Sequence, residues 1–148
     1  MTVESTLAPR VPAFADELRE ILVKDRHVDC AWLFGSMARG DAGPLSDVDV
    51  AVLLDPSVPP EARLDIATAL VEHLERLCGR VDLVLIDEAP PALRHRVFRE
   101  GLLLFERDVR RRVAFEVRAI QEYLDFQPLA EVYDRALIAR AAGGRLGR

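Results

Sequence analysis

Residues 33–54 read LFGSMARGDAGPLSDVDVAVLL and hold the most informative pattern in the chain. The run from Asp47 to Leu54 alternates aspartate with valine and then becomes wholly apolar, which predicts a β-strand. Because residues two apart in a strand point to the same face, the carboxylates of Asp47 and Asp49 are expected to project together. Aspartate is disfavoured in strands, so a pair at the head of this one indicates a functional site.

The segments on either side predict a small mixed sheet flanked by helices, an α/β (α+β) architecture. Apolar residues recurring every three or four positions predict helices, and short apolar runs predict strands. The expected elements are a helix over 13–24, strands over 28–34 and 47–54, a short turn over 37–43, a helix over 61–78, a strand over 81–86, a helix over 90–99, a strand over 102–105, and helices over 107–125 and 129–142. Pro128 is expected to separate the last two helices.

Length and composition predict one folded domain. The chain has 148 residues, half of them hydrophobic and 30% charged, which suits a single core. We expect one domain over 1–148, with a core at about 13–106, a C-terminal helical segment at about 107–142 and a frayed tail over 143–148.

The same composition bears on location and partners. No apolar run approaches the ~20 residues of a membrane span, and no secretory signal is visible. Cys30 and Cys78 lie in apolar surroundings, which favours free thiols in a reducing cytoplasm. The net charge of −5 argues against direct binding of nucleic acid.

A third aspartate, Asp82, lies inside the otherwise apolar run over 81–86. A carboxylate there is costly unless it is paired or binds a ligand. The helical crossover over 61–78 allows its strand to lie parallel and adjacent to the Asp47 strand, which brings the three carboxylates together. Carboxylates that converge need cations or protons, and oxygen ligands suit Mg²⁺.

Gly35 and Ser36, at the end of the preceding strand, supply a second feature. The glycine allows close approach of the backbone to a ligand, and the backbone N–H groups that follow can bind an anion. The Ser36 hydroxyl is placed to contact phosphate, and Arg39 is placed to contact phosphate or to pair with a nearby acid. Triphosphate, metal and carboxylates in one cleft favour phosphoryl or nucleotidyl transfer.

Each residue taken alone has a simpler interpretation. Gly35–Ser36 can be an ordinary turn, Asp47 a capping or turn residue, and Asp82 the partner of an arginine. All three interpretations must hold together to dismiss the site.

Two other features leave alternatives open. Seven arginines between 94 and 112 form either a solvated basic face or a docking surface for an acidic partner or for phosphate. An apolar strip repeats along the predicted helix over 107–125, and we expect most of it to pack on the sheet. The arginines are Arg94, Arg96, Arg99, Arg107, Arg110, Arg111 and Arg112, and the apolar strip is Val109, Val113, Val117, Ile120 and Leu124.

The spacing of Gly35–Ser36, ten intervening residues and Asp47-Val48-Asp49 resembles the signature of the DNA polymerase β-like nucleotidyltransferase superfamily. The fuller string, Gly-Ser-Met-Ala-Arg-Gly followed by Ser-Asp-Val-Asp, resembles its minimal MNT-domain branch. Within that branch it resembles the MntA antitoxins of HepT/MntA toxin–antitoxin systems.

The resemblance implies a polymerase β-like palm fold and two Mg²⁺ ions held by Asp47, Asp49 and Asp82. It further implies that Gly35 and Ser36 hold the triphosphate of ATP, and we add Arg39 and Ser46 as nucleotide-binding residues. The implied activity is AMP transfer to a tyrosine hydroxyl of a HEPN-domain RNase toxin similar to HepT, whose antitoxin this chain would be.

Two other functions remain open at this point. One is adenylylation of a small molecule such as an aminoglycoside, which needs a homodimer or a further domain to complete the acceptor pocket. The other is a non-enzymatic antitoxin that acts by occlusion. The segment after residue 106 looks too small to form a second substrate-binding domain, which favours a protein acceptor docked on the arginines or on the apolar strip.

Overall fold

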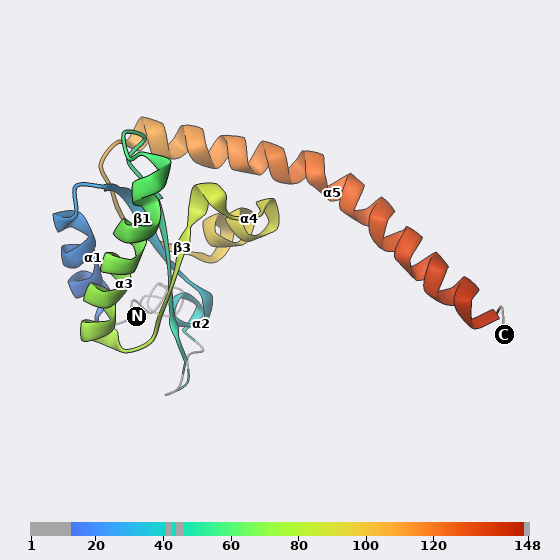
Figure 1. Cartoon of the computed structure of the whole chain (residues 1–148), viewed down its shortest axis with the longest axis horizontal. Helices are drawn as coiled ribbons and strands as arrows, with labels where there is room; N and C mark the ends of the chain where they lie inside the picture. The colour runs from blue at the N-terminus through green and yellow to red at the C-terminus, as the bar shows by residue number, and fades with distance from the viewer. Residues whose placement is uncertain (1–12, 41–42, 44–45, 147–148) are drawn as a thin grey trace, which may run out of the picture.

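The computed structural model describes residues 13–40, 43 and 46–146, and a four-stranded sheet forms its centre (Figure 1). The strands are β1 (Val28–Phe34), β2 (Val48–Leu54), β3 (Val81–Leu85) and β4 (Leu102–Glu106), in the order β3-β2-β1-β4. β1 is antiparallel to β2 and β4, whereas β2 and β3 are parallel. The predicted mixed sheet flanked by helices is therefore confirmed.

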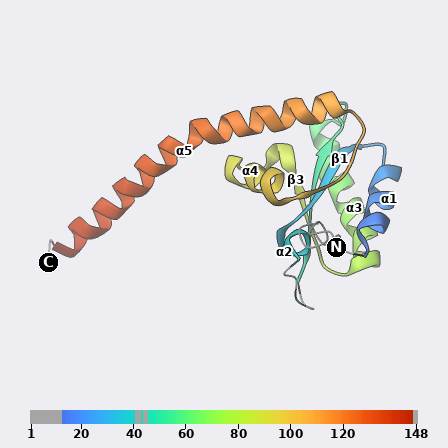
Figure 2. The ribbon, with the colours of Figure 1, turned by 180° about the vertical axis from the view of Figure 1, so that it is seen from behind.

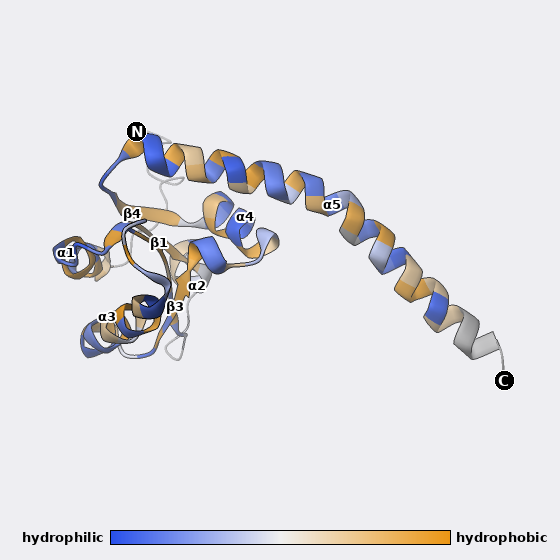
Figure 3. Ribbon diagram, turned by 45° about the horizontal axis from the view of Figure 1, so that its top comes forward, coloured by the Kyte–Doolittle hydropathy of each residue, from blue (hydrophilic) through white to orange (hydrophobic). Residues whose placement is uncertain are grey.

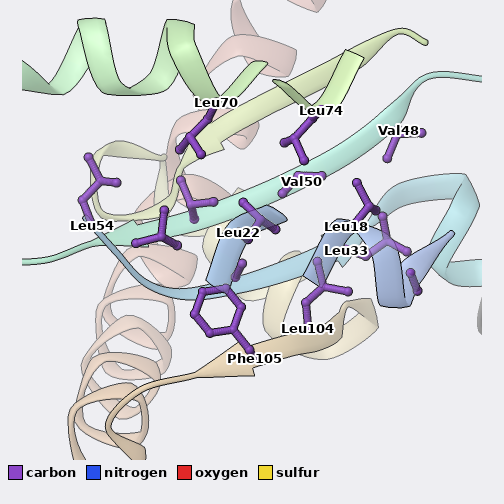
Figure 4. Packing of buried hydrophobic residues seen from close by; sticks show 14 of the residues in the cluster. Leu18, Leu22, Leu33, Val48, Val50, Leu54, Leu70, Leu74, Leu104 and Phe105 are labelled. Atoms are coloured by element: carbon purple, nitrogen blue, oxygen red, sulfur yellow. The ribbon is translucent and has the colours of Figure 1, made fainter. Parts of the chain in front are cut away.

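Helices α1 (Ala15–Lys24) and α3 (Arg63–Cys78) cover one face of the sheet. A 3₁₀ turn, η2 (Pro60–Ala62), leads into α3. Leu22 of α1 and Leu74 of α3 meet Leu33 and Val50 of the central strands, and all four are fully buried (Figure 4). This face is closed by aliphatic packing, so it has no room for polar chemistry.

Helix α4 (Pro91–Glu100) and the first part of α5 (Val109–Leu146) cover the opposite face. A 3₁₀ turn, η3 (Ile86–Glu88), connects β3 to α4, and the short helix α2 (Gly35–Arg39) follows β1 directly. The rings of Trp32 and Phe98 lie 5.3 Å apart, and those of Phe98 and Phe115 lie 5.8 Å apart edge to face. These aromatic contacts join sheet, α4 and α5 into one layered body.

Helix α5 runs without interruption from Val109 to Leu146 and includes Pro128. The predicted break at Pro128 is therefore wrong, as is the tail over 143–146, while 147–148 lie outside the described residues. A proline inside a helix removes one backbone hydrogen bond and crowds the preceding turn, which bends helices more readily than it ends them when both flanks are helical. Figure 1 shows that α5 bends along its length.

The expected packing of the apolar strip on the sheet is also wrong. Its five residues are 41–57% exposed. Phe115, Ala119 and Tyr123, spaced four residues apart, instead turn toward the body: Phe115 and Tyr123 contact α4, and Ala119 is 1% exposed. The strip lies on another side of the same helix.

The last part of α5 projects away from the rest of the molecule (Figures 1 and 2). Apolar and polar residues alternate along it (Figure 3), and several large apolar side chains there are exposed: Phe126, Leu129, Val132, Tyr133, Leu137 and Ile138. Within the described part of the chain, no helix is both long and apolar enough to cross a membrane.

Candidate active site

Asp49 lies near the head of β2, between two strands that bring other predicted site residues beside it. It is the registered partner of Phe34 across the antiparallel pair and of Asp82 across the parallel pair. The neighbouring strands of a sheet lie about 4.8 Å apart. Two aspartates separated by a whole helix in sequence are therefore neighbours, as the crossover predicted.

Asp49 and Asp82 also share one face of the sheet. Val48 and Val50 pack into the α1/α3 core, so Asp49, between them, projects to the α4 face. Val84, two residues beyond Asp82, packs with the residues under α4, which places Asp82 on that face too. Asp82 is exposed, and it makes no ion pair with an arginine within the described ranges. The simpler interpretation of Asp82 as the partner of an arginine is thus not supported.

Asp47 lies just before β2 and is exposed. Burial raises the pKa of the Asp49 carboxyl, and the negative charges of Asp82 and Asp47 raise it further. Arg96 and Arg39 oppose this rise in the Asp49 pKa, though without cancelling it. The half-buried carboxyl of Asp49 therefore interacts with the negative charges of Asp82 and Asp47 and with the positive charges of Arg96 and Arg39.

Gly35 adopts a left-handed backbone, with φ of +71°. A Cβ at this position would lie 3.0 Å from Cγ and 3.3 Å from Cβ of Asp49, and closer still to its Oδ2. The missing side chain of Gly35 thus provides the space in which the Asp49 carboxylate lies. Glycine is needed here for two reasons, the backbone angle and the close approach.

The remaining predicted site residues lie around this point. Ser36 is half-buried in the first turn of α2, and its carbonyl accepts a hydrogen bond from the N–H of Gly40. Arg39 ends α2, and its Nη1 lies 3.6 Å from Oε2 of Glu100 on α4. The Ser46 hydroxyl oxygen accepts a hydrogen bond from the Gly43 N–H at 2.9 Å, and Ser46 lies two residues before β2.

The donor set fits a hard divalent cation, because Asp49 and Asp82 are paired on one face of the sheet, and because burial and then the negative charges of Asp82 and Asp47 raise the pKa of Asp49. Among the described residues, no three carboxylate, histidine or cysteine groups are already arranged as a finished metal cage. Asp47, Asp49 and Asp82 could hold a cation that brings further ligands of its own, as Mg²⁺ does with phosphate and water.

The arginine-rich stretch divides into two kinds of residue, which sequence reasoning did not separate. Four of its members make specific internal contacts. Arg107 donates to the carbonyls of Val28, Val23 and Asp25, and Arg111 pairs with the buried Asp29. Arg94 pairs with Glu122, and Arg112 pairs with Glu106 and Glu116.

Arg96 is different, because it is exposed and its charge acts on Asp49. Sequence reasoning placed it in the basic stretch and not in the site. No local pattern distinguishes it from its neighbours, since its position depends on how α4 packs.

Known proteins are similar to this chain in sequence and in fold. A family model described as polymerase beta, nucleotidyltransferase matches residues 16–110. That range contains the whole sheet and every predicted site residue. No curated protein matches the chain.

Several solved toxin–antitoxin structures are similar to the chain. A structure of a toxin–antitoxin with AMP-PNP has 26% sequence identity and a TM-score of 0.66, and the match covers 83% of this chain and 98% of that chain. An MntA–HepT toxin–antitoxin structure has 23% identity and a TM-score of 0.61, covering 84% of this chain and 96% of that one.

A third structure, a tri-AMPylated HEPN toxin in complex with MNT antitoxin from Shewanella oneidensis, has 23% identity and a TM-score of 0.62, covering 84% and 95%. The two structures at 23% identity share the fold with this chain. The family match over most of the chain is the stronger finding, and it contains the Asp47, Asp49 and Asp82 positions. The chain therefore belongs to the polymerase beta nucleotidyltransferase family.

Proposed function

We propose that the chain is a Mg²⁺-dependent nucleotidyltransferase that moves AMP from ATP to a tyrosine hydroxyl of a HEPN-type toxin and so acts as its antitoxin. The observation that carries this proposal is the pairing of Asp49 with Asp82 on one face of the sheet, directly beside Gly35. The similar structure solved with AMP-PNP supports ATP as the donor, and the AMPylated HEPN toxin supports the acceptor class.

The reaction is a single displacement at the α-phosphorus of ATP. The acceptor oxygen forms a bond to this phosphorus, the bond from it to the bridging oxygen of the β-phosphate breaks, and pyrophosphate leaves. The carboxylate of Asp82, exposed at the open side of the pair, accepts the hydroxyl proton. Asp47, Asp49 and Asp82 would hold two Mg²⁺ ions, which supply charge neutralisation and acidify the acceptor hydroxyl when bound.

The other residues bind and orient the nucleotide. The turn at Gly35 and Ser36 offers backbone N–H groups and a hydroxyl to the triphosphate. Arg39 contacts phosphate from the end of α2, held in place by Glu100. Ser46, next to Asp47 in the chain, bonds the Gly43 N–H through its hydroxyl oxygen and faces the nucleotide from that side.

The acceptor protein docks on the apolar strip of α5. Its five residues are exposed, although they repeat with the spacing that normally marks a buried helix face. Exposed apolar residues in a continuous patch mark interaction surfaces. We place the reaction in the cytoplasm, where the free thiols of Cys30 and Cys78 remain reduced.

The decisive experiment is intact mass spectrometry of both proteins. The chain is incubated with Mg²⁺, with each of the four nucleoside triphosphates in turn, and with the product of the neighbouring gene. We expect one or more AMP additions on the partner with ATP and none with the other three triphosphates. Asp47→Asn and Asp49→Asn should each abolish these additions. Asp65→Asn is the matched control, because Asp65 is exposed on α3, on the other side of the sheet. Full transfer in either site variant would refute the metal assignment.

Two further experiments distinguish the other two functions from this one. Label from α-labelled ATP that appears on an aminoglycoside and not on protein would show a small-molecule transferase. Protection of cells by Asp47→Ala, with no AMP on the partner, would show neutralisation by occlusion alone.

A further inference from the structure

Helix α4 presents three sides to three different neighbours. Leu93 and Val97 pack on the sheet beneath it. A second side contacts α5 through Arg94, His95 and Phe98. The third side carries Arg96 and Glu100, which are four residues apart and so lie one above the other on the helix.

This third side faces α2 and the carboxylates. Glu100 reaches Arg39 of α2, which fixes the direction in which the Arg96/Glu100 side points. The end of α4 lies against the end of β1, since a Cβ on Gly101 would be 3.3 Å from the carbonyl oxygen of Leu33. The chain turns into Gly35 two residues after Leu33, so Arg96 lies at the site end of the sheet.

The electrostatics agree with this placement. Arg96 lies close enough to Asp49 for their opposite charges to attract each other. Within the part of the chain that the structure describes, Arg96 has no hydrogen-bonding or ion-pair partner, whereas Arg94 pairs with Glu122. Its guanidinium is thus exposed, close to the acidic group, with its donors available to a ligand.

We propose that Arg96 binds the β- and γ-phosphates of the nucleotide and holds the pyrophosphate as it leaves. This inference rests on the proposed function. A guanidinium presents paired donors that match two phosphate oxygens, and the site needs such a group because its carboxylates repel the triphosphate. Arg39 from α2 and Arg96 from α4 approach the same region from two helices, so the phosphates lie between them.

The test measures binding, apart from turnover. Isothermal titration calorimetry with Mg²⁺ present compares inorganic pyrophosphate, ATP and AMP on the full chain and on Arg96→Gln. We expect the variant to bind pyrophosphate and ATP about 10-fold more weakly, which is about 1.4 kcal/mol, and to bind AMP within about 2-fold of the unaltered chain. AMP lacks the two phosphates that Arg96 contacts.

Arg99→Gln is the matched control, because Arg99 is exposed on the same helix but off the Arg96/Glu100 side. It removes the same charge and is expected to change pyrophosphate affinity less than about 2-fold. Arg96→Lys keeps the charge and loses the paired donors, so its affinity should fall between those of the unaltered chain and Arg96→Gln.

Three results would overturn the assignment. Unchanged pyrophosphate affinity in both Arg96→Gln and Arg96→Lys, or an equal loss in Arg99→Gln, would remove the role of Arg96 and leave the transferase intact. An unaltered chain that binds neither ATP nor pyrophosphate would remove the proposed function, and this inference with it.

Discussion

Replacing Gly35 with alanine separates the two demands that the site places on this residue. Gly35 and Gly40 both have positive φ angles, +71° and +78°. An alanine forced into this conformation costs about 1–2 kcal/mol. For a chain of this size 1 kcal/mol lowers the Tm by about 2–4 °C, so Gly35→Ala and Gly40→Ala should each lose about 2–8 °C.

The two variants differ in what the new methyl group meets. At Gly35 it would press on the Asp49 carboxylate, with Cγ only 3.0 Å away, whereas at Gly40 nothing in the described residues lies within 4 Å. Asp49 must therefore move in one variant and not in the other. Because a misplacement of about 1 Å costs roughly 100-fold in rate, we expect about that loss in Gly35→Ala and less than about 2-fold in Gly40→Ala.

The assay follows AMP addition to the partner by intact mass against time, and unfolding by circular dichroism in the same buffer. A Gly35→Ala variant that transfers AMP at the original rate would refute the close approach of Gly35 to Asp49 as a requirement. Equal losses of rate in the two variants would show that backbone strain alone is responsible.

Three further predictions follow from the charges and from α5. Without divalent ions, Asp49→Asn should raise the Tm near neutral pH. Because the pKa of Asp49 is raised in the native state, that state holds the proton more tightly, and stability falls as the pH rises from the usual aspartate pKa through the raised one. A Tm series against pH that is equally steep in the variant contradicts this. Arg111→Ala should cost about 1–3 kcal/mol in urea unfolding by leaving the buried Asp29 without its partner, while Arg110→Ala, an exposed neighbour, stays within about 0.5 kcal/mol. Val117→Ser should change the free energy of unfolding by less than about 0.5 kcal/mol, because Val117 is 47% exposed. It should nevertheless weaken partner binding about 10-fold in calorimetry, and unchanged affinity would rule out the apolar strip as the docking surface.

The sheet and the proximity of Asp49 to Asp82 were predictable because short-range patterns determine them. The run from Asp47 to Leu54 has the composition of a strand, and the helix after it is long enough to return the chain for a parallel neighbour. Both strands begin with Val-Asp. When they lie side by side with their first residues aligned, Asp49 is opposite Asp82.

Helix α5 was harder, for two physical reasons. Helical periodicity shows which residues share a side, but not which side meets the body, so the apolar strip was assigned to the core in place of the Phe115 and Ala119 side. A proline inside a helix lowers the stability of the helix but does not always end it. The residues on both sides of Pro128 are helical, and α5 includes it without a break.

The arginines show a third limit of sequence reasoning. Arg94 and Arg111 pair with acids, and Arg107 donates to a backbone carbonyl, all far away in the chain, and no spacing rule encodes such partners. Arg96 lies within the same stretch and points to the site instead. Only the packing of α4 decides between the two outcomes.

The projecting part of α5 has a consequence for partner binding. The last part of α5 leaves the body (Figure 2), and its large apolar side chains from Phe126 to Ile138 are exposed, so substitutions there leave the packing of the sheet and its helices undisturbed. A second protein seated on the apolar strip could therefore gain further contacts along this rod without any change in the residues proposed to handle the nucleotide.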